Sequence, residues 1–78
     1  MDASTTTIER DRLGSSATAA DMAHFAAHLA EFLDADRRSL KYQIRGDSDV
    51  MALTVVGIDD SDIHAIVSAA LDTSWWIR

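Results

Sequence analysis

Residues 40–56 read LKYQIRGDSDVMALTVV, and this stretch decides the fold. From Leu40 to Arg45 apolar and polar residues alternate, which is typical of a strand with one buried face. The GDSD sequence at 46–49 consists of turn-forming residues, and Val50 begins a nearly continuous apolar run that ends at Val56. The stretch therefore predicts a β-hairpin whose second strand has apolar residues on both faces.

A helix is predicted on each side of this hairpin. Thr18 and Asp21 resemble a capping box, and the next residues are mostly good helix formers. One face of that helix carries the apolar residues Met22, Phe25, Leu29, Phe32 and Leu33. After Gly57, several N-cap residues predict a second helix from about residue 60 to residue 71. Its apolar stripe consists of Ile63, Ile66, Val67, Ala70 and Leu71.

The two ends of the chain differ in composition. Residues 1–17 are rich in Ser, Thr and charged residues, which favours a flexible N-terminal tail over the alternative, a short edge strand from Thr5 to Arg10. Thr73 to Ile77 is rich in aromatic and β-branched residues and predicts a final strand, parallel to the second strand of the hairpin.

These elements predict one α+β domain over residues 18–78, with the order α-β-β-α-β. Seventy-eight residues are enough for a single hydrophobic core and no more. Packing both helices on one face of a small three-stranded mixed sheet is the simplest way to bury both apolar stripes. The other face of the sheet then stays uncovered.

Composition excludes several classes of protein. The net charge of −6 argues against a general nucleic-acid binder, and residues 46–72 contain aspartates but no basic residue. With no cysteine, disulfides and thiolate metal sites are excluded. The sequence contains neither a long apolar segment nor a signal-peptide pattern, so we expect a cytoplasmic protein that does not contact a membrane.

The sequence gives little support to catalysis or metal binding. It contains no nucleophile motif, and its glycines at 14, 46 and 57 are isolated, so we expect neither an enzyme nor a cofactor. His24 and His28 are four residues apart on the first helix, a spacing that can place two imidazoles on one metal ion. Weak pairing with Asp21 and Glu31 explains the same pattern, so the two histidines are only weak metal candidates.

A protein interface is the favoured functional feature. Trp75 and Trp76 are adjacent in the predicted last strand, so one of them points away from the helices. Exposed Trp is common at the centre of protein interfaces. The predicted apolar anchors are Trp75, Trp76 and Met51, and the predicted electrostatic steering residues are Asp47, Asp49, Asp59, Asp60 and Asp62.

We therefore expect a small acidic protein-binding module that forms a homodimer. One concrete version is an inhibitor or regulator that occupies a basic surface on a larger protein, as phage inhibitors of host defence systems do. One alternative is a nucleic-acid-associated regulator that uses the basic residues Arg37, Arg38, Lys41 and Arg45. The other is a metal-binding module that uses His24 and His28.

Overall fold

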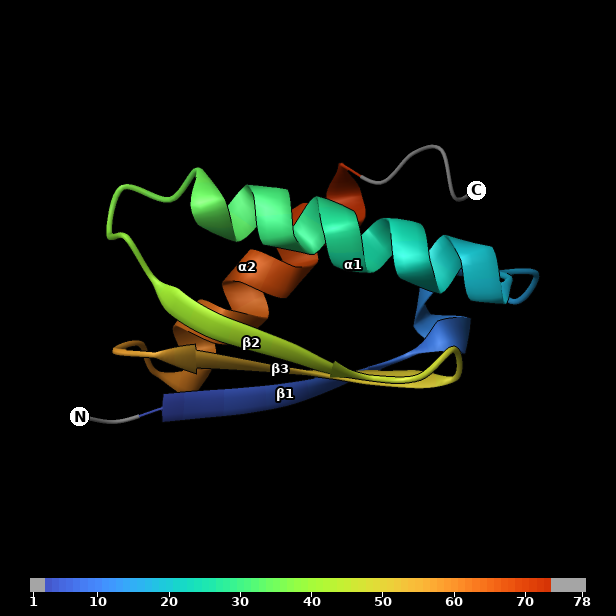
Figure 1. The fold of residues 1–78 in the computed structure, drawn as a ribbon, viewed down its shortest axis with the longest axis horizontal. Coiled ribbons are helices and arrows are strands. Elements are labelled where there is room, and N and C mark those ends of the chain that lie inside the picture. The colour runs from blue at the N-terminus through green and yellow to red at the C-terminus, as the bar shows by residue number, and fades with distance from the viewer. Residues whose placement is uncertain (1–2, 74–78) are drawn as a thin grey trace.

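A computed structural model describes residues 3–73 of the chain and shows an α+β fold. The strands are β1 (Ala3–Glu9), β2 (Lys41–Gly46) and β3 (Val50–Val56), and the helices are α1 (Ala19–Asp34) and α2 (Asp60–Asp72). A short 3-10 helix, η1 (Arg10–Leu13), follows β1. The strands form an antiparallel three-stranded sheet in the order β1-β3-β2, and both helices lie on the same side of it (Figure 1).

The predicted hairpin is confirmed. β2 pairs with β3 from Lys41 opposite Val56 to Gly46 opposite Met51. In the turn, Asp47 Oδ1 accepts hydrogen bonds from the backbone N–H groups of Asp49 at 2.8 Å and of Val50 at 3.1 Å. These bonds, with that of Asp49 first, hold the pKa of the Asp47 carboxyl below its ordinary value.

Both predicted helices are confirmed, together with their N-caps. Thr18 Oγ1 accepts from Asp21 N–H at 3.2 Å, and Asp21 Oδ2 accepts from Thr18 N–H at 2.8 Å, which completes the capping box of α1. Asp59 Oδ1 caps α2 by accepting from Asp62 N–H at 2.9 Å. The apolar stripes of the two helices face the sheet and form the core with it. The buried core residues are Ile8, Leu13, Met22, Phe25, Leu29, Leu33, Met51, Leu53, Val55, Ile58, Ile63, Ile66, Val67 and Ala70.

The prediction of a flexible tail is wrong for residues 3–13. Residues 3–9 form β1, which pairs with β3 from Ala3 opposite Val56 to Glu9 opposite Val50. Ile8 is fully buried, and Ser4 Oγ donates a hydrogen bond to the carbonyl oxygen of Ile58 at 2.9 Å. The alternative of an edge strand near residues 5–10 was the better interpretation, because Thr-rich segments have a high β propensity.

The third strand of the described sheet is therefore the N-terminal β1, where a C-terminal strand was predicted. The order of the described elements is β-α-β-β-α, and the described sheet is antiparallel where a mixed sheet was predicted. Thr73, predicted to begin a strand, is the C-cap of α2, and its N–H donates to the carbonyl of Ala69. Residues 74–77 of the predicted strand lie outside the described residues.

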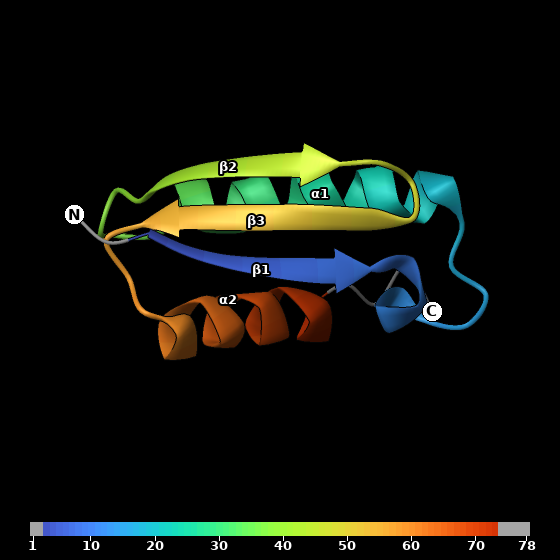
Figure 2. The same ribbon diagram turned by 90° about the horizontal axis from the view of Figure 1, so that it is seen from below.

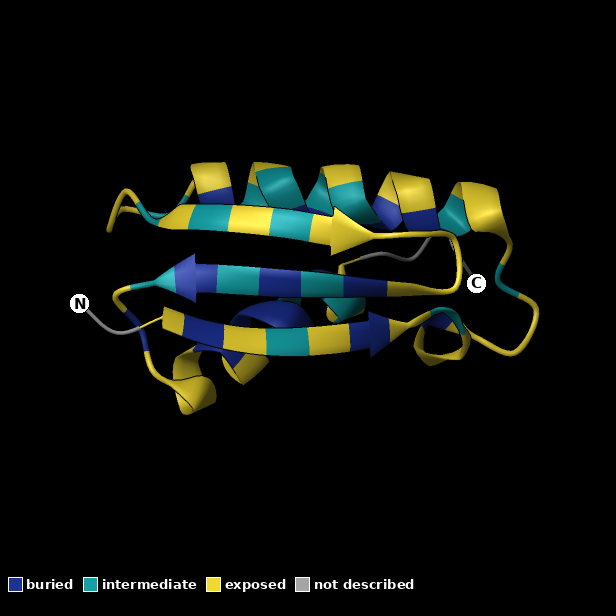
Figure 3. Ribbon diagram, turned by 60° about the horizontal axis from the view of Figure 1, so that its bottom comes forward, coloured by how far each residue is buried: buried dark blue, intermediate teal, exposed yellow. Residues whose placement is uncertain are grey.

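Burial alternates along the strands, as Figure 3 shows for β1 and β3. In β3 the side chains of Met51, Leu53 and Val55 point toward the helices and are buried. Tyr42 and Ile44 of β2 point the same way but remain half-buried, because β2 is an edge strand. Neither of the described helices lies over the opposite face of the sheet (Figure 2).

Replacing Ile8 with Ala tests whether residues 3–9 belong to the fold. Because Ile8 is fully buried, we expect Ile8→Ala to lower the free energy of unfolding by about 2–4 kcal/mol in urea denaturation. Thr7→Ala, on the exposed side of the same strand, is the control and should change it by less than about 0.5 kcal/mol. Equal small effects of the two substitutions would show that this segment does not contribute to the core.

Gly46 is required by the close approach of the two hairpin strands. Its φ is +132°, and a Cβ atom at this position would collide with the carbonyl oxygen of Val50. We expect Gly46→Ala to destabilise the fold by about 2–3 kcal/mol. Gly57→Ala is the matched control, because Gly57 also has a positive φ, +91°, but no atom lies within 4 Å of the added Cβ. We expect this variant to lose about 1 kcal/mol of stability. If thermal denaturation showed the same loss of stability in both variants, the collision with Val50 would not be the cause of the effect at Gly46.

Candidate functional site

The surface of the sheet opposite the helices is the candidate functional site, and it is called the open face below. Register and alternation place eleven residues on it. They are Ala3, Thr5, Thr7 and Glu9 of β1, Val50, Ala52, Thr54 and Val56 of β3, and Lys41, Gln43 and Arg45 of β2. Figure 2 views the molecule from this side, with β2 and β3 in front of α1 and with α2 alongside β1.

The middle of the open face carries small side chains. Val50, at 38% exposure, is the one large apolar residue classed as exposed among the described residues. Ala52 and Thr54 are half-buried between their neighbours in β1 and β2. The hydroxyl groups of Thr5 and Thr54 are 2.9 Å apart and share a hydrogen bond across the strands. The face thus presents both methyl groups and hydroxyl groups to a binding partner.

The charges of the open face differ in sign from those of the whole chain. Lys41 and Arg45 are exposed on β2, and Glu9 is the one acidic residue of this face. With the Gln43 amide oriented so that its oxygen faces Arg45, that oxygen accepts hydrogen bonds from Arg45 Nε and Nη2, both at 3.0 Å. The face therefore carries an excess of positive charge on a chain whose net charge is −6.

The predicted steering aspartates do not form one surface. Asp47 and Asp49 lie in the hairpin turn before β3, and the other three lie beyond its far end (Figure 2). Seven residues of strand separate the two groups by about 23 Å. Asp47 is used in the turn and Asp59 in the cap of α2, while Asp60 and Asp62 lie in the first turn of that helix.

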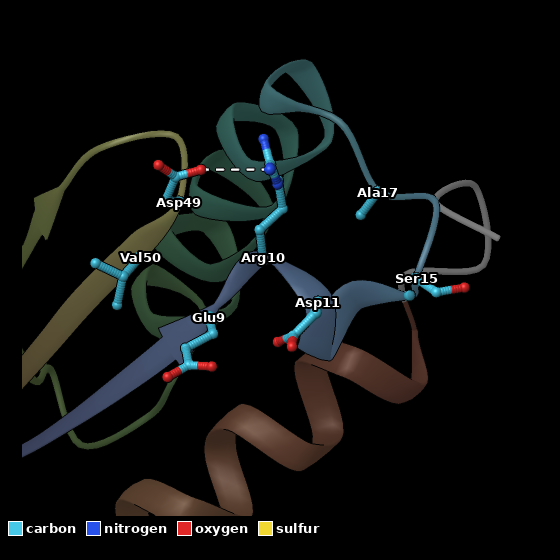
Figure 4. A pocket seen from close by; sticks show the side chains of 8 residues that line it. Glu9, Arg10, Asp11, Ser15, Ala17, Asp49 and Val50 are labelled. Atoms are coloured by element: carbon cyan, nitrogen blue, oxygen red, sulfur yellow. Dashed lines mark ion pairs between the residues drawn. The ribbon is translucent and has the colours of Figure 1, made fainter.

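The hairpin end contains the pocket that Figure 4 shows. Arg10 Nη2 lies 3.3 Å from Asp49 Oδ1, and the Arg10 N–H donates to the carbonyl of Asp49 at 2.8 Å. Glu9 and Asp11 line the same depression but point away from this ion pair (Figure 4). The depression has a volume of about 510 Å³ and is wide open to solvent. Its polar contacts join η1 to the hairpin turn, which is a structural role.

The opposite end of the molecule holds a second ion-pair group. Arg38 Nε and Nη2 donate to the two carboxylate oxygens of Asp36, each at 3.0 Å, and Arg38 Nη1 lies 3.9 Å from Asp62 Oδ2. The hydrogen bonds from the Arg38 side chain, followed by that from its backbone N–H, lower the pKa of Asp36 to about 2. This group joins the loop after α1 to the start of α2.

The four residues of the predicted basic patch lie in two different places. Arg38 is occupied by Asp36, and Arg37 is exposed in the loop between α1 and β2. Lys41 and Arg45 do share a surface, the open face, as their alternation in sequence indicated. Two of the four predicted basic residues are thus brought together with the hydroxyl groups of β1 and β3.

The predicted apolar anchors need correction. Met51 is 4% exposed and points into the core between the sheet and the helices, so it is not available at the surface. The reason is that β3 turns Met51, Leu53 and Val55 toward the helices, and the smaller set that begins with Val50 forms the open face. Trp75 and Trp76 lie outside the described residues.

The two helical histidines occupy different surroundings. His24 is exposed on α1, whereas the Nε2 atom of His28 lies 2.7 Å from Thr73 Oγ1 at the end of α2. The His28 ring also lies between the rings of Phe25 and Phe32, with both centroids 6.4 Å away. Within residues 3–73 no group of three side chains is arranged to hold a metal ion.

No family model, no curated protein and no solved structure matches this chain. Among residues 3–73, no helix has the length and apolar character needed to span a lipid bilayer.

The Asp36–Arg38 contact predicts a pH dependence of stability. Because the folded pKa of about 2 lies below the ordinary value of 3.8, the contribution of Asp36 is present at higher pH and is lost as the pH falls toward 2. NMR titration of the Asp36 carboxyl should give a midpoint near 2, and Arg38→Ala should return it toward 3.8. A midpoint near 3.8 in the unmodified protein would contradict the contact.

Proposed function

We propose that this chain is a small non-enzymatic protein-binding module, which binds an acidic segment of a partner protein on the open face of its sheet. The observation that carries the proposal is the charge of that face. Lys41 and Arg45 stand beside a row of small side chains on β3 and β1. Among the described residues, Glu9 is the one acidic residue on this face.

Local charge decides which segment fits this face. At physiological ionic strength interactions between exposed charges are screened beyond about 8 Å. A segment lying along β2 therefore interacts most strongly with Lys41 and Arg45, the exposed cations of that strand. Acidic side chains of the segment are attracted by these two cations, while basic side chains are repelled.

The shape of the face also favours a polypeptide partner. An extended segment or a second sheet can cover small side chains closely, and the hydroxyl groups of Thr5, Thr7 and Thr54 provide hydrogen bonds to it. Nucleic-acid binding on a sheet normally uses aromatic side chains for stacking, and the eleven residues of the open face include none.

The non-enzymatic part of the proposal is supported by the lining of the depression at the hairpin end. It contains carboxylates, one arginine in an ion pair and one serine, with no histidine or lysine to activate that serine as a nucleophile. A partner with a basic surface stays a prediction. The five aspartates that would bind such a partner are divided between the two ends of β3.

The proposal is tested by NMR titration of the labelled protein with three probes: a Glu-rich extended peptide, its Lys-rich counterpart and a single-stranded oligonucleotide. We expect the acidic peptide to shift the amide signals of β2 and β3 and its affinity to fall as salt is added. Arg45→Glu should weaken binding on the order of tenfold, because it reverses one of the two cations of the face.

Arg12→Glu is the matched control, because it makes the same change of charge at an exposed residue of η1 away from the face. It should leave the affinity for the acidic peptide nearly unchanged. Binding of the Lys-rich peptide, or equal losses in the two variants, would contradict the proposal. Binding of the oligonucleotide to the open face would favour the nucleic-acid alternative instead.

A further inference from the structure

The sheet has two edges, and within residues 3–73 only the β1 edge is flanked by a helix. Figure 2 shows α2 lying alongside β1, and the Ser4 hydroxyl on β1 bonds to the segment that leads into α2. No described element lies beyond β2 in the same view. An unpaired strand edge can form hydrogen bonds with a strand of another chain, and proteins usually block such edges.

Hydrogen bonding within the hairpin determines which backbone groups of β2 face outward. The Asp47 N–H donates to the carbonyl of Val50 at 2.9 Å, so positions 47 and 50 form a hydrogen-bonded pair. Because such pairs alternate in an antiparallel ladder, Gln43 and Arg45 also bond to β3. The backbone N–H and C=O groups of Tyr42 and Ile44 therefore point away from the sheet.

We infer that β2 pairs antiparallel with β2 of a second copy of this chain, with Ile44 at the twofold axis, to form a continuous six-stranded sheet. This register places the outward backbone groups of Ile44 opposite those of Ile44 in the second copy. It also places Tyr42 opposite Gly46 of the second copy. Both are hydrogen-bonded pairs, as the alternation requires.

The charges along β2 and at the start of the hairpin turn select this register. With Ile44 at the axis, Lys41 stands opposite Asp47 of the second copy, and Gln43 opposite Arg45 of the second copy. Each contact occurs twice because of the symmetry. Moving the axis by one residue to Gln43 would place Lys41 opposite Arg45, which is a like-charge pair and destabilising. The edge is therefore complementary to itself in one register and unfavourable in the next.

The side chains on the helix-covered face fit the same register. Tyr42 and Ile44 point toward the helices but are only half-buried. Part of their apolar surface is therefore exposed to solvent at the edge of the sheet. The Tyr42 hydroxyl donates to Asp34 Oδ1 at 2.7 Å, which holds the ring in place. In the pair, that ring would lie beside Gly46 of the second copy, which has no side chain to obstruct it.

A groove between α1 and the β2 edge provides apolar surface that a dimer can bury in addition to the two paired strands. It lies between the first half of α1 and the hairpin, with a volume of about 380 Å³. Ala23, Ala26 and Ile44 contribute to its walls. Since α1 lies over β2 and β3 in Figure 2, the twofold axis would bring the two copies of α1 side by side in antiparallel orientation. Their small side chains permit close packing of the helices.

This dimer does not depend on the proposed function of the open face. Pairing at the edge leaves that face uncovered and joins the open faces of two copies into one surface. The dimer and the binding of an acidic segment are therefore tested by separate measurements.

Disulfide trapping tests the register directly. In a hydrogen-bonded antiparallel pair the Cα atoms are about 5.5 Å apart, within the range for a disulfide. The chain contains no cysteine, so Ile44→Cys has one thiol per copy. We expect this variant to form a covalent dimer on mild oxidation, while Thr7→Cys on β1 remains largely uncrosslinked.

The unmodified protein provides an independent measurement, which covers the case in which Ile44→Cys fails to fold. Sedimentation analysis should show a dimer, and hydrogen exchange should show that the amides of Tyr42 and Ile44 become protected as the protein concentration rises. In a monomer these two amides point to solvent and exchange rapidly. Amides of Gln43 and Arg45 bond within the hairpin and should be protected at all concentrations.

Charge variants complete the test. Lys41→Glu should raise the dissociation constant of the dimer by about tenfold or more, because it replaces two attractive pairs with two repulsive ones. Adding Asp47→Asn, which keeps an acceptor for the turn, should recover part of the loss. Arg37→Glu makes the same change of charge in the exposed loop and is the control. The inference would be overturned if the protein stayed monomeric at millimolar concentration. It would also be overturned if the dimer crosslinked through Thr7→Cys and its dissociation constant did not change in Lys41→Glu.

Discussion

The central position of β3 is the constraint on which the rest of the structure depends. This strand is apolar on both faces, and its residues Met51, Leu53 and Val55 are buried beneath the helices. A central strand needs a hydrogen-bonded neighbour on each side, because unpaired backbone groups in a buried position are costly. β2 satisfies one side through a short turn. On the other side β3 pairs with β1, a segment more than forty residues away along the chain.

The same constraint produces the candidate functional surfaces. Two helices are enough to cover one side of a three-stranded sheet, so the smaller apolar residues of β3 remain on the open face. The alternation of β2 then places Lys41 and Arg45 beside them. Because β2 is an edge strand with no described element beyond it, its outward backbone groups also remain available for another strand.

Several features could be predicted from the sequence because their signals are local. The alternation from Leu40 to Arg45, the turn that follows and the capping pair of Thr18 and Asp21 each act within a few residues. Other predictions failed because they depend on contacts between distant segments. A Thr-rich segment resembles a polar tail until a partner strand is known, and Met51 can point either way until the covered face of β3 is known.

The sequence by itself determined the hairpin, both helices, their caps and the α+β class, since each follows from hydrophobic periodicity or turn chemistry over short distances. Only the tertiary structure decided that residues 3–9 complete the sheet, that the five aspartates lie at opposite ends of β3 and that Lys41 and Arg45 lie on an uncovered face. The physical reason is that strand pairing and burial join residues far apart in the chain. Backbone hydrogen bonds between strands are the same for nearly every residue type, so the choice of partner leaves little trace in the local sequence.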